Sequence, residues 1–163
     1  MMDERAKHIR FVVVCALVVV ADQLTKWMVV AWLPFHSRIP VIPGFANVVH
    51  VTNPGGAFGL FADQDPIVRI ILFIGVACVA AGLVFFLHWR TPAEHWPLTT
   101  GFALIFGGAV GNLADRIRIG EVVDFIDLHI GGRHWPAFNI ADSAISIGMV
   151  IFAYYLIVKK IPE

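Results

Sequence analysis

Two aspartates occupy ordered, largely apolar motifs near the last two hydrophobic segments of the chain. Asp124 lies in the segment VVDF and Asp142 in the segment FNIADS. A carboxylate at the centre of a membrane helix costs roughly 2.5–3.5 kcal/mol on insertion scales, so such a residue needs a specific role. Two carboxylates that converge share a proton and titrate as a unit. One then acts as a base on water and the other as an acid, which is chemistry suited to peptide hydrolysis without a metal.

Other interpretations of the acidic residues stay open from spacing alone. Asp142 falls where a helix is expected to begin, so it is also typical of an interfacial helix cap. Asp124, Asp127 and His129 carry metal-ligating groups, but their spacing matches no strong ligand pattern. Acid-pair hydrolysis therefore competes with a structural cap and, more weakly, with a metal centre.

Polar residues in the last hydrophobic segment share one helical face. Asn139, Asp142 and Ser146 recur at i, i+3 and i+7. Asn139 is a second candidate for the helix cap, because asparagine side chains accept hydrogen bonds from free backbone amides. We expect this face to lie near the extracytoplasmic end of the helix.

The segment GGAVGNLADR combines small and polar residues at helical spacing. Gly107 and Gly108 begin it, and each is followed four residues later by a small or polar residue, a pattern that lets another helix approach closely. Asn112 and Arg116 share a face and are expected to point toward that contact. Asp115 beside Arg116 is interpreted as a neutralised structural pair at the membrane surface.

Asp22 and Lys26 lie one helical turn apart in the first hydrophobic segment. The acid precedes the base, which is the favourable order for an i, i+4 pair. An ion pair that stabilises helix packing within the membrane is the simpler interpretation. The alternative is that one of the two orients loop or substrate groups near the candidate site.

The composition is that of a membrane protein. Of the 163 residues 58% are apolar, and the mean hydropathy is +0.77. Twelve basic and twelve acidic side chains give no net charge, and no basic stripe indicates a nucleic-acid partner. Cys15 and Cys78 lie in apolar runs without metal-type spacing, so we expect small buried hydrophobes rather than a disulfide.

Four hydrophobic spans, each near the ~20 residues that a bilayer requires, must position these groups. They cover about 11–33, 66–89, 97–113 and 140–158 of a single domain, 1–163. The first span is too long to be a cleavable signal peptide, and polar residues at 22, 23 and 26 interrupt it, so it is expected to stay as an anchor.

The basic residues predict the orientation, because short cytoplasmic loops are enriched in lysine and arginine. One group would fall on the cytoplasmic side together with both termini: Arg5, Lys7, Arg10, Arg90, Lys159 and Lys160. The segments 34–65 and 114–139 are then extracytoplasmic. Four arginines within them weaken the bias: Arg38, Arg116, Arg118 and Arg133.

The extracytoplasmic segments contain a β-type run and an acidic stretch. The run NVVHVT, which begins at Asn47, is followed by the flexible turn NPGGAFG, which begins at Asn53. An open sheet edge cannot face hydrocarbon, so this strand should lie at the interface or against protein. The stretch from Asp124 to Leu128 is expected to form a short interfacial helix that returns Asp124 to the mouth between the third and fourth spans.

Five sequence blocks, in this order along the chain, resemble those of the lipoprotein signal peptidase family (signal peptidase II). The members of this family are bacterial membrane aspartic peptidases. The blocks are DQLTK at 22–26, NPGGAFG at 53–59, GGAVGNLADR at 107–116, VDF at 123–125 and FNIADS at 138–143. Each block alone is a weak signal, but five in this order across nearly the whole chain are specific. Gly56 departs from the family, which more often has alanine there, and is expected to loosen the turn.

The resemblance implies that Asp124 and Asp142 are the catalytic dyad. It implies supporting roles for Asn53, Asn112, Arg116 and Asn139 around the substrate, and for Asp22 and Lys26 as polar supports in the bundle. Gly107 and Gly108 would leave a groove for the signal helix. The implied fold is an all-α membrane protein of four transmembrane helices with a small extracytoplasmic β-cradle and a short interfacial helix.

The same resemblance implies the partners and the compartment. The substrate would be a prolipoprotein whose cysteine already carries diacylglycerol, cut just before that cysteine, with no metal or cofactor. Membrane lipids and a globomycin-type inhibitor are the other expected partners, and the protein is expected to act as a monomer. It would reside in the bacterial cytoplasmic (inner) membrane with its site facing outward.

Three other functions compete with peptide hydrolysis. A transporter or proton pathway would relay ions through Asp22, Lys26 and Asp142, and would spread ionisable groups across the membrane depth. A non-catalytic scaffold would tolerate neutral replacement of both aspartates of the dyad. A lipid-headgroup hydrolase would need a phosphate cradle, for which the sequence shows no clear pattern.

Overall fold

Four long apolar helices form the body of the computed structural model, which describes residues 3–55 and 65–159. They are α1 (Glu4–Trp32), α2 (Pro66–Arg90), α3 (Trp96–Ile119) and α4 (Ile140–Tyr154), and α4 continues through a π-helical turn, Tyr155–Lys159. Within the described residues, four helices are long and apolar enough to cross a membrane. The predicted four-span membrane fold is therefore confirmed.

Two helices extend further than hydropathy predicted. Helix α1 begins at Glu4, seven residues before the expected start at position 11. The side chain of Asp3 caps it by accepting a hydrogen bond from the backbone amide of Arg5 at 2.9 Å. Helix α3 continues beyond position 113 to Gly120, whose φ of 78° gives the left-handed cap that favours glycine. Polar residues form these extra turns, so a hydropathy criterion does not include them.

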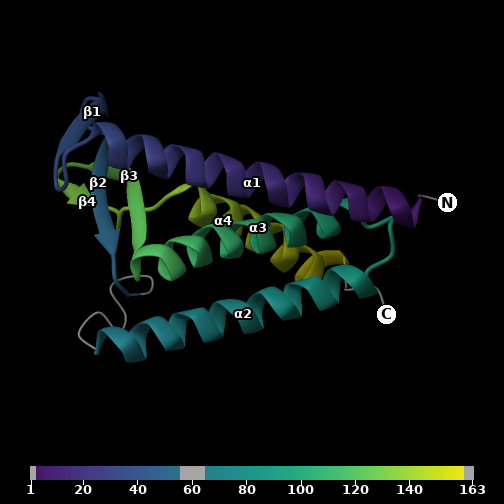
Figure 1. The fold of residues 1–163 in the computed structure, drawn as a ribbon. Coiled ribbons are helices and arrows are strands. Elements are labelled where there is room, and N and C mark those ends of the chain that lie inside the picture. The colour runs from purple at the N-terminus through teal and green to yellow at the C-terminus, as the bar shows by residue number, and fades with distance from the viewer. Residues whose placement is uncertain (1–2, 56–64, 160–163) are drawn as a thin grey trace.

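A four-stranded antiparallel sheet lies at one end of the bundle (Figure 1). Its strands are β1 (Arg38–Ile42), β2 (Ala46–Asn53), β3 (Val122–Ile130) and β4 (Arg133–His134), hydrogen-bonded in that order. The start of α1 and the end of α4 lie at the opposite end of the bundle. The sheet joins the two chain segments that lie outside the spans and brings them over one end of the helices.

The expected interfacial helix at 124–128 is wrong, because these residues belong to strand β3. Asp124 pairs with Val51 and Val122 pairs with Asn53 across the β2–β3 ladder. The β-branched pair Val122–Val123 favours a strand once a partner strand supplies hydrogen bonds. Between the spans, the described residues contain no separate short helix. The remainder of the expected turn, from Gly56 to Gly59, lies outside the described residues.

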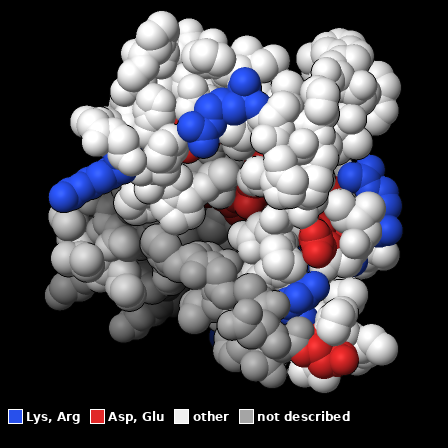
Figure 2. Space-filling view, turned by 90° about the vertical axis from the view of Figure 1, so that its left-hand side faces the viewer, with Lys and Arg blue, Asp and Glu red and all other residues white. Residues whose placement is uncertain are grey.

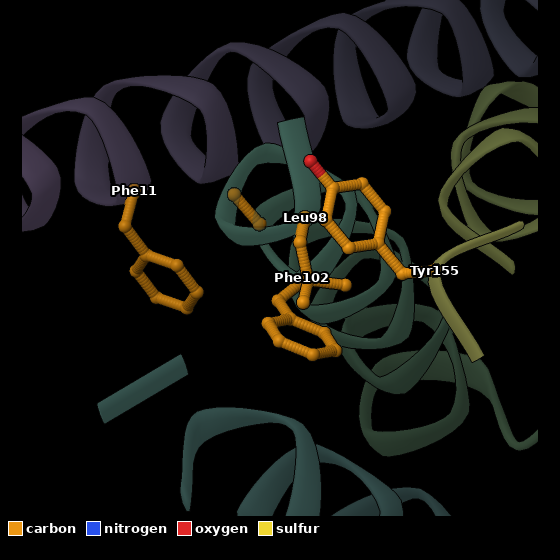
Figure 3. Close-up of a cluster of buried hydrophobic side chains, with 5 residues drawn as sticks. Phe11, Leu98, Phe102 and Tyr155 are labelled. Atoms are coloured by element: carbon orange, nitrogen blue, oxygen red, sulfur yellow. The ribbon is translucent and has the colours of Figure 1, made fainter. Parts of the chain in front are cut away.

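The apolar core of the bundle gathers at the end away from the sheet. Figure 3 shows Phe11 from α1, Leu98 and Phe102 from α3, and Tyr155 at the end of α4. Leu98 is fully buried and Phe102 is nearly so. The end beneath the sheet buries Asp22, Lys26, Asp115 and Asn139. This polar cluster and the apolar cluster therefore lie at different ends of the bundle, although Lys7 and His88 are also buried near the apolar one.

The two cysteines lie on different helices and form no disulfide. Cys15 in α1 and Cys78 in α2 are both free thiols. The Sγ atom of Cys15 donates to the backbone oxygen of Ala103 at 3.3 Å, so this thiol packs as a small residue between α1 and α3. The expected burial is wrong for Cys78, which is exposed on the surface of α2.

Glycines on α3 allow two helices to approach it closely. A Cβ atom added at Gly107 would lie 3.1 Å from the backbone of Cys15 on α1. A Cβ atom at Gly108 would clash with the backbone oxygen of Ala141 on α4. Close helix packing is thus the role of both residues in the structure. The groove that they were expected to leave for a signal helix is filled by α1 and α4.

Replacement of Gly108 by alanine should destabilise the bundle. The added methyl group would also lie 2.7 Å from the Ile145 side chain, so α4 has to move away from α3. We expect Gly108→Ala to lower the free energy of unfolding by about 1–3 kcal/mol, measured by thermal unfolding in detergent. Gly82→Ala is the matched control, because nothing lies within 4 Å of its added Cβ atom. Equal melting temperatures for the two variants would contradict this packing role.

Candidate active site

A cavity of about 560 Å³ opens beneath the sheet, and both predicted carboxylates line it. Its wall is formed by residues from β2, α3, β3, α4 and the segment before α4: Asn53, Asn112, Arg116, Val122, Asp124, Trp135, Pro136, Ala137, Phe138, Asp142, Ser143, Ile145, Ser146 and Ile147. Figure 2 looks onto this end of the molecule and shows acidic atoms recessed near the middle of the face. The fold thus brings five of the predicted site residues to one cavity from four elements.

Asp124 is held on strand β3 at the cavity wall. Its side chain is 3% exposed, and its Oδ1 atom accepts a hydrogen bond from Nδ2 of Asn139 at 2.7 Å. The Asn53 side chain on the neighbouring strand β2 also hydrogen-bonds to it. These contacts fix the carboxyl group where β3 passes the start of α4.

Asp142 lies in the first turn of α4, where it caps the helix as the sequence analysis expected. Its Oδ2 atom accepts from the backbone amide of Asn139 at 3.3 Å, while its own amide donates to Oδ1 of Asn139 at 2.9 Å. This reciprocal capping box fixes the side chain. The Oδ1 atom accepts from Nδ2 of Asn112 at 2.8 Å. Asp142 is therefore a helix cap whose carboxylate also lines the cavity.

Asn139 connects the two aspartates. It is fully buried, and its side-chain Nδ2 donates to Asp124. Its backbone amide donates to Asp142 and its side-chain Oδ1 accepts from the amide of Asp142, which completes the capping box. Its Nδ2 atom also lies 3.1 Å from Oδ1 of Asn112 and 3.2 Å from the backbone oxygen of Val123. One asparagine thus sets the positions of both carboxyl groups.

The environment of Asp124 keeps this carboxyl group protonated to unusually high pH. Burial and then the charge of Asp142 raise its pKa to about 7, although hydrogen bonds from Asn139 and Asn53 and the charge of Lys26 act in the opposite direction. The influence of Asp142 on this pKa means that the two carboxyl groups interact electrostatically. The pair can therefore hold one proton near neutral pH, as acid–base catalysis by two carboxyl groups requires.

A buried ion cluster lies under the cavity. Nζ of Lys26 is 2.8 Å from Oδ2 of Asp22 and 2.9 Å from Oδ2 of Asp115, and all three side chains are fully buried. The same nitrogen donates to Oδ1 of Asn112 at 2.9 Å. The predicted ion pair between Asp22 and Lys26 is confirmed. Lys26 also contacts Asn112, which lines the cavity, so it is joined to the cavity wall as well as to the bundle.

The expected surface pair between Asp115 and Arg116 is wrong. Adjacent residues on a helix point in different directions, whereas residues three apart lie on one face. Asp115 turns inward to Lys26, and its Oδ1 atom lies 3.2 Å from Nη2 of Arg118. Arg116 turns to the cavity, where its Nη2 atom donates to the backbone oxygen of Gly55 at 3.2 Å. Its guanidinium also lies over the Phe73 ring, 5.0 Å from the centroid.

The ion cluster also holds the backbone beside each cavity aspartate, which sequence reasoning missed. Oδ1 of Asp22 accepts from the backbone amide of Ala141 at 3.0 Å, one residue before Asp142. Oδ2 of Asp115 accepts from the amide of Val123 at 3.2 Å, one residue before Asp124. Lys26 binds both of these carboxylates, so one ammonium group stabilises the two anchors of the site.

Gln23 is a further residue that sequence reasoning did not single out. Its Nε2 atom lies 3.2 Å from Oδ2 of Asp22, 3.2 Å from Oδ1 of Asp115 and 3.1 Å from the backbone oxygen of Gly111. It thus joins the two acids of the ion cluster to the backbone of α3. Its place next to Asp22 inside an apolar span was the available signal.

Asp127 is directed away from the cavity. It hydrogen-bonds to His134 and Asn47, and it is absent from the cavity wall that contains Asp124. Among residues 3–55 and 65–159, no group of three histidine, cysteine or acidic side chains is arranged to hold a metal ion. The combination of Asp124, Asp127 and His129 that the sequence left open is therefore not assembled as a ligand set.

Comparisons with known proteins show the family to which the chain is similar. A family model described as signal peptidase (SPase) II matches residues 14–158. The lipoprotein signal peptidase of Desulforapulum autotrophicum is 50% identical over 99% of both chains. That of Syntrophus aciditrophicus is 43% identical over 93% of this chain and 94% of the relative.

Two solved structures of bacterial membrane enzymes share the fold. One, determined by the in meso method at 2.3 Å resolution, has a TM-score of 0.80 and 30% identity, covering 94% of this chain and 93% of the other. The second, at 1.9 Å resolution, has a TM-score of 0.81 and 29% identity, covering 92% of this chain and 94% of the other. The similarity therefore extends over nearly the whole chain in both sequence and structure.

Proposed function

This chain belongs to the signal peptidase II family, the membrane peptidases that remove signal peptides from prolipoproteins, and we propose that it does so with Asp124 and Asp142. The substrate that we infer is a prolipoprotein whose cysteine carries diacylglycerol, with the cleaved bond just before that cysteine. The observation that carries this proposal is the bridge through Asn139, which holds both carboxyl groups at one cavity.

In the proposed mechanism the two carboxyl groups share one proton. Asp124 holds it at the start, because burial and the charge of Asp142 keep its pKa at about 7. Asp142 is ionised and accepts hydrogen bonds from Asn112 and from the backbone of Asn139. Asp142 takes a proton from the attacking water while Asp124 protonates the carbonyl oxygen of the cleaved peptide bond. The resulting tetrahedral species then collapses, and a proton passes to the leaving amine of the cysteine.

The surroundings of the dyad suit a substrate that arrives from the membrane. Ser143, Ser146 and Ile147 line the cavity along α4, within the span. Arg116 lines the cavity beside the turn at Gly55, where its guanidinium can bind a substrate carbonyl or a lipid headgroup oxygen. A lipid-bearing cysteine stays close to the bilayer surface, so its preceding peptide bond can reach carboxyl groups at the helix ends.

We also infer the orientation and compartment from the two ends of the bundle. Arg5 and Lys7 lie in the first turns of α1 and Arg90 ends α2, at the end opposite the sheet. Since cytoplasmic ends are enriched in basic residues, the sheet and the cavity would face outward from the bacterial inner membrane, with both termini in the cytoplasm. A C-terminal fusion to an enzyme that matures only outside the cytoplasm should therefore remain inactive.

The test of the proposed function is cleavage of a synthetic lipobox peptide by the purified protein. The peptide carries a diacylglyceryl-modified cysteine, and mass spectrometry should find a single cut before that cysteine. A matched peptide with an unmodified cysteine should be cleaved far more slowly, and globomycin should inhibit the reaction. A cut at another bond, or equal cleavage of both peptides, would contradict the proposed substrate.

The shared proton predicts the pH dependence of cleavage. The folded protein holds the pKa of Asp124 above its ordinary value of 3.8, at about 7, so the proton is retained below that pH and lost above it. We expect kcat/KM to fall about tenfold per pH unit above about 7, measured with the lipidated peptide between pH 6 and 9. Return to pH 6 should restore full activity, because the cause is titration and not unfolding. A flat profile across this range would exclude Asp124 as the proton donor.

A further inference from the structure

A short arch of chain, Trp135–Phe138, forms one wall of the cavity. Both of its ends are hydrogen-bonded to β3. The amide of Trp135 donates to the backbone oxygen of Leu128 at 2.8 Å, and the amide of Phe138 donates to that of Ile126 at 3.1 Å. The two residues between these ends, Pro136 and Ala137, also line the cavity. The position of this arch therefore determines the width of the cavity on the side of the sheet.

The residue that precedes the arch is bound to the body of the sheet. Nδ1 of His134 lies 2.7 Å from Oδ1 of Asp127 on β3, and Nδ2 of Asn47 on β2 donates to Oδ2 of Asp127 at 2.7 Å. Asp127 is 5% exposed, and Nε of Arg38 on β1 lies 3.7 Å from its Oδ2 atom. Asp127 is thus fixed by contacts from strands β1 and β2. We call its contact with His134 the His134 tether, because it connects the arch to these strands.

The His134 tether supports a hairpin that has little backbone pairing of its own. Strand β4 contains two residues, and it follows a turn in which Gly131 and Gly132 have φ values of 57° and 79°. So short a strand is only weakly held by its backbone hydrogen bonds. The side-chain contact from His134 therefore adds to the backbone hydrogen bonds that hold β4 and the arch that follows.

The carboxyl partner of the tether is favoured in its ionised form. Burial would raise the pKa of Asp127, but hydrogen bonds from His134 and Asn47, with the charges of His134 and Arg38, lower it overall. The carboxylate therefore stays ionised at neutral pH and accepts a proton-bearing Nδ1 atom. His129 is the other titratable group at this place, with its ring edge-on to His134 at 4.8 Å between centroids.

We propose that the arch contacts the residues of the substrate that follow the cleaved bond, and that the His134 tether sets its position. This inference rests on the proposed function. The signal segment occupies the membrane, where Ser146 and Ile147 line the cavity along α4. The chain beyond the cysteine has to leave the bilayer on the side of the sheet, where the arch lies. Trp135 is 62% exposed at this end, and its amphipathic ring suits contact with a peptide at the interface.

His134 is accordingly a positioning residue for substrate specificity, and a pair of substitutions tests this role. His134→Ala removes the donor, whereas His134→Asn keeps an N–H group near the place of Nδ1. The two substrates are lipidated peptides that differ only in the residue after the cysteine, serine in one and tryptophan in the other. We expect His134→Ala to raise KM about five- to tenfold with little change in kcat, and to reduce the difference between the two peptides.

His134→Asn should restore both KM and the discrimination between the peptides. Arg133→Ala is the matched control in the same strand, because Arg133 is exposed and is expected to leave cleavage unchanged. A fall in kcat at constant KM, or an unchanged ratio between the two peptides, would overturn the inference. Trp135→Ala provides a second test if His134→Ala fails to fold, and an unchanged ratio there would also overturn it.

The same experiment separates this inference from the proposed function. If the wild-type protein cleaves the lipidated peptides and His134→Ala discriminates between them as the wild-type protein does, the proposed function stays intact. The role of the tether is then excluded. Failure of the wild-type protein to cleave either lipidated peptide would overturn the proposed function and this inference together.

Discussion

Asp124→Asn and Asp142→Asn should each reduce cleavage of the lipidated peptide by about 10³–10⁴-fold or more. An amide has nearly the shape of a carboxyl group, but it neither accepts a proton from water nor donates one to the substrate. The double variant should be no slower than either single variant, because the two groups act as one unit. Initial rates measured by mass spectrometry at pH 6.5 provide the test.

The loss of activity should occur without loss of the fold. Because folding raises the pKa of Asp124 from 3.8 to about 7, its ionisation weakens the folded state as the pH rises through this range. Asp124→Asn removes that charge, so at pH 8 the variant should unfold at the same temperature as the wild-type protein or at a higher one. Glu121→Gln is a control at the same end of the bundle, where the acid pairs with Arg69 at 3.9 Å, and its rate should change less than twofold. Substantial cleavage by either dyad variant would exclude the proposed mechanism.

The spans of this fold could be predicted because each depends on local composition, whereas strand β3 could not. The length and hydropathy of the four hydrophobic runs are sufficient to predict the spans. The stretch from Val122 to Leu128 mixes apolar and acidic residues in a way that suits a short interfacial helix or a strand. Its partner strand β2 ends at Asn53, far away in the sequence, and only the register between the two decides the outcome.

The sequence similarly identified five of the residues that line the cavity but not all the contacts between them. The motif around Asn139 and Asp142 predicted a helix start, and the capping box confirms it. The hydrogen bond from Asn139 to Asp124 depends on the path of β3, which local patterns do not contain. Asp115 differs from its predicted pairing for a related reason, because the lysine that it contacts lies on another helix.

Replacement of Lys26 by methionine should have the second large effect, on stability and cleavage together. The change leaves Asp22 and Asp115 fully buried without the ammonium group that lies between them. Breaking a buried ion pair by removing one partner costs about 3–5 kcal/mol, and the same acids hold the backbone of Ala141 and Val123 beside the dyad. We therefore expect a large fall in melting temperature in detergent and little or no cleavage at 25 °C.

Two further variants separate the buried charges from the loss of lysine packing. Lys7→Met also removes a buried lysine from α1, but its acidic partner Glu4 has a 60% exposed side chain that water can solvate, so the loss should be smaller. Adding Asp22→Asn to Lys26→Met neutralises one of the two buried acids that lost the ammonium group. The other acid, Asp115, keeps its contact with Arg118. The melting temperature of this double variant should therefore recover in part. Normal cleavage by Lys26→Met would instead mean that the dyad keeps its geometry without the ion cluster, and that Asn139 and Asn112 are sufficient to hold it.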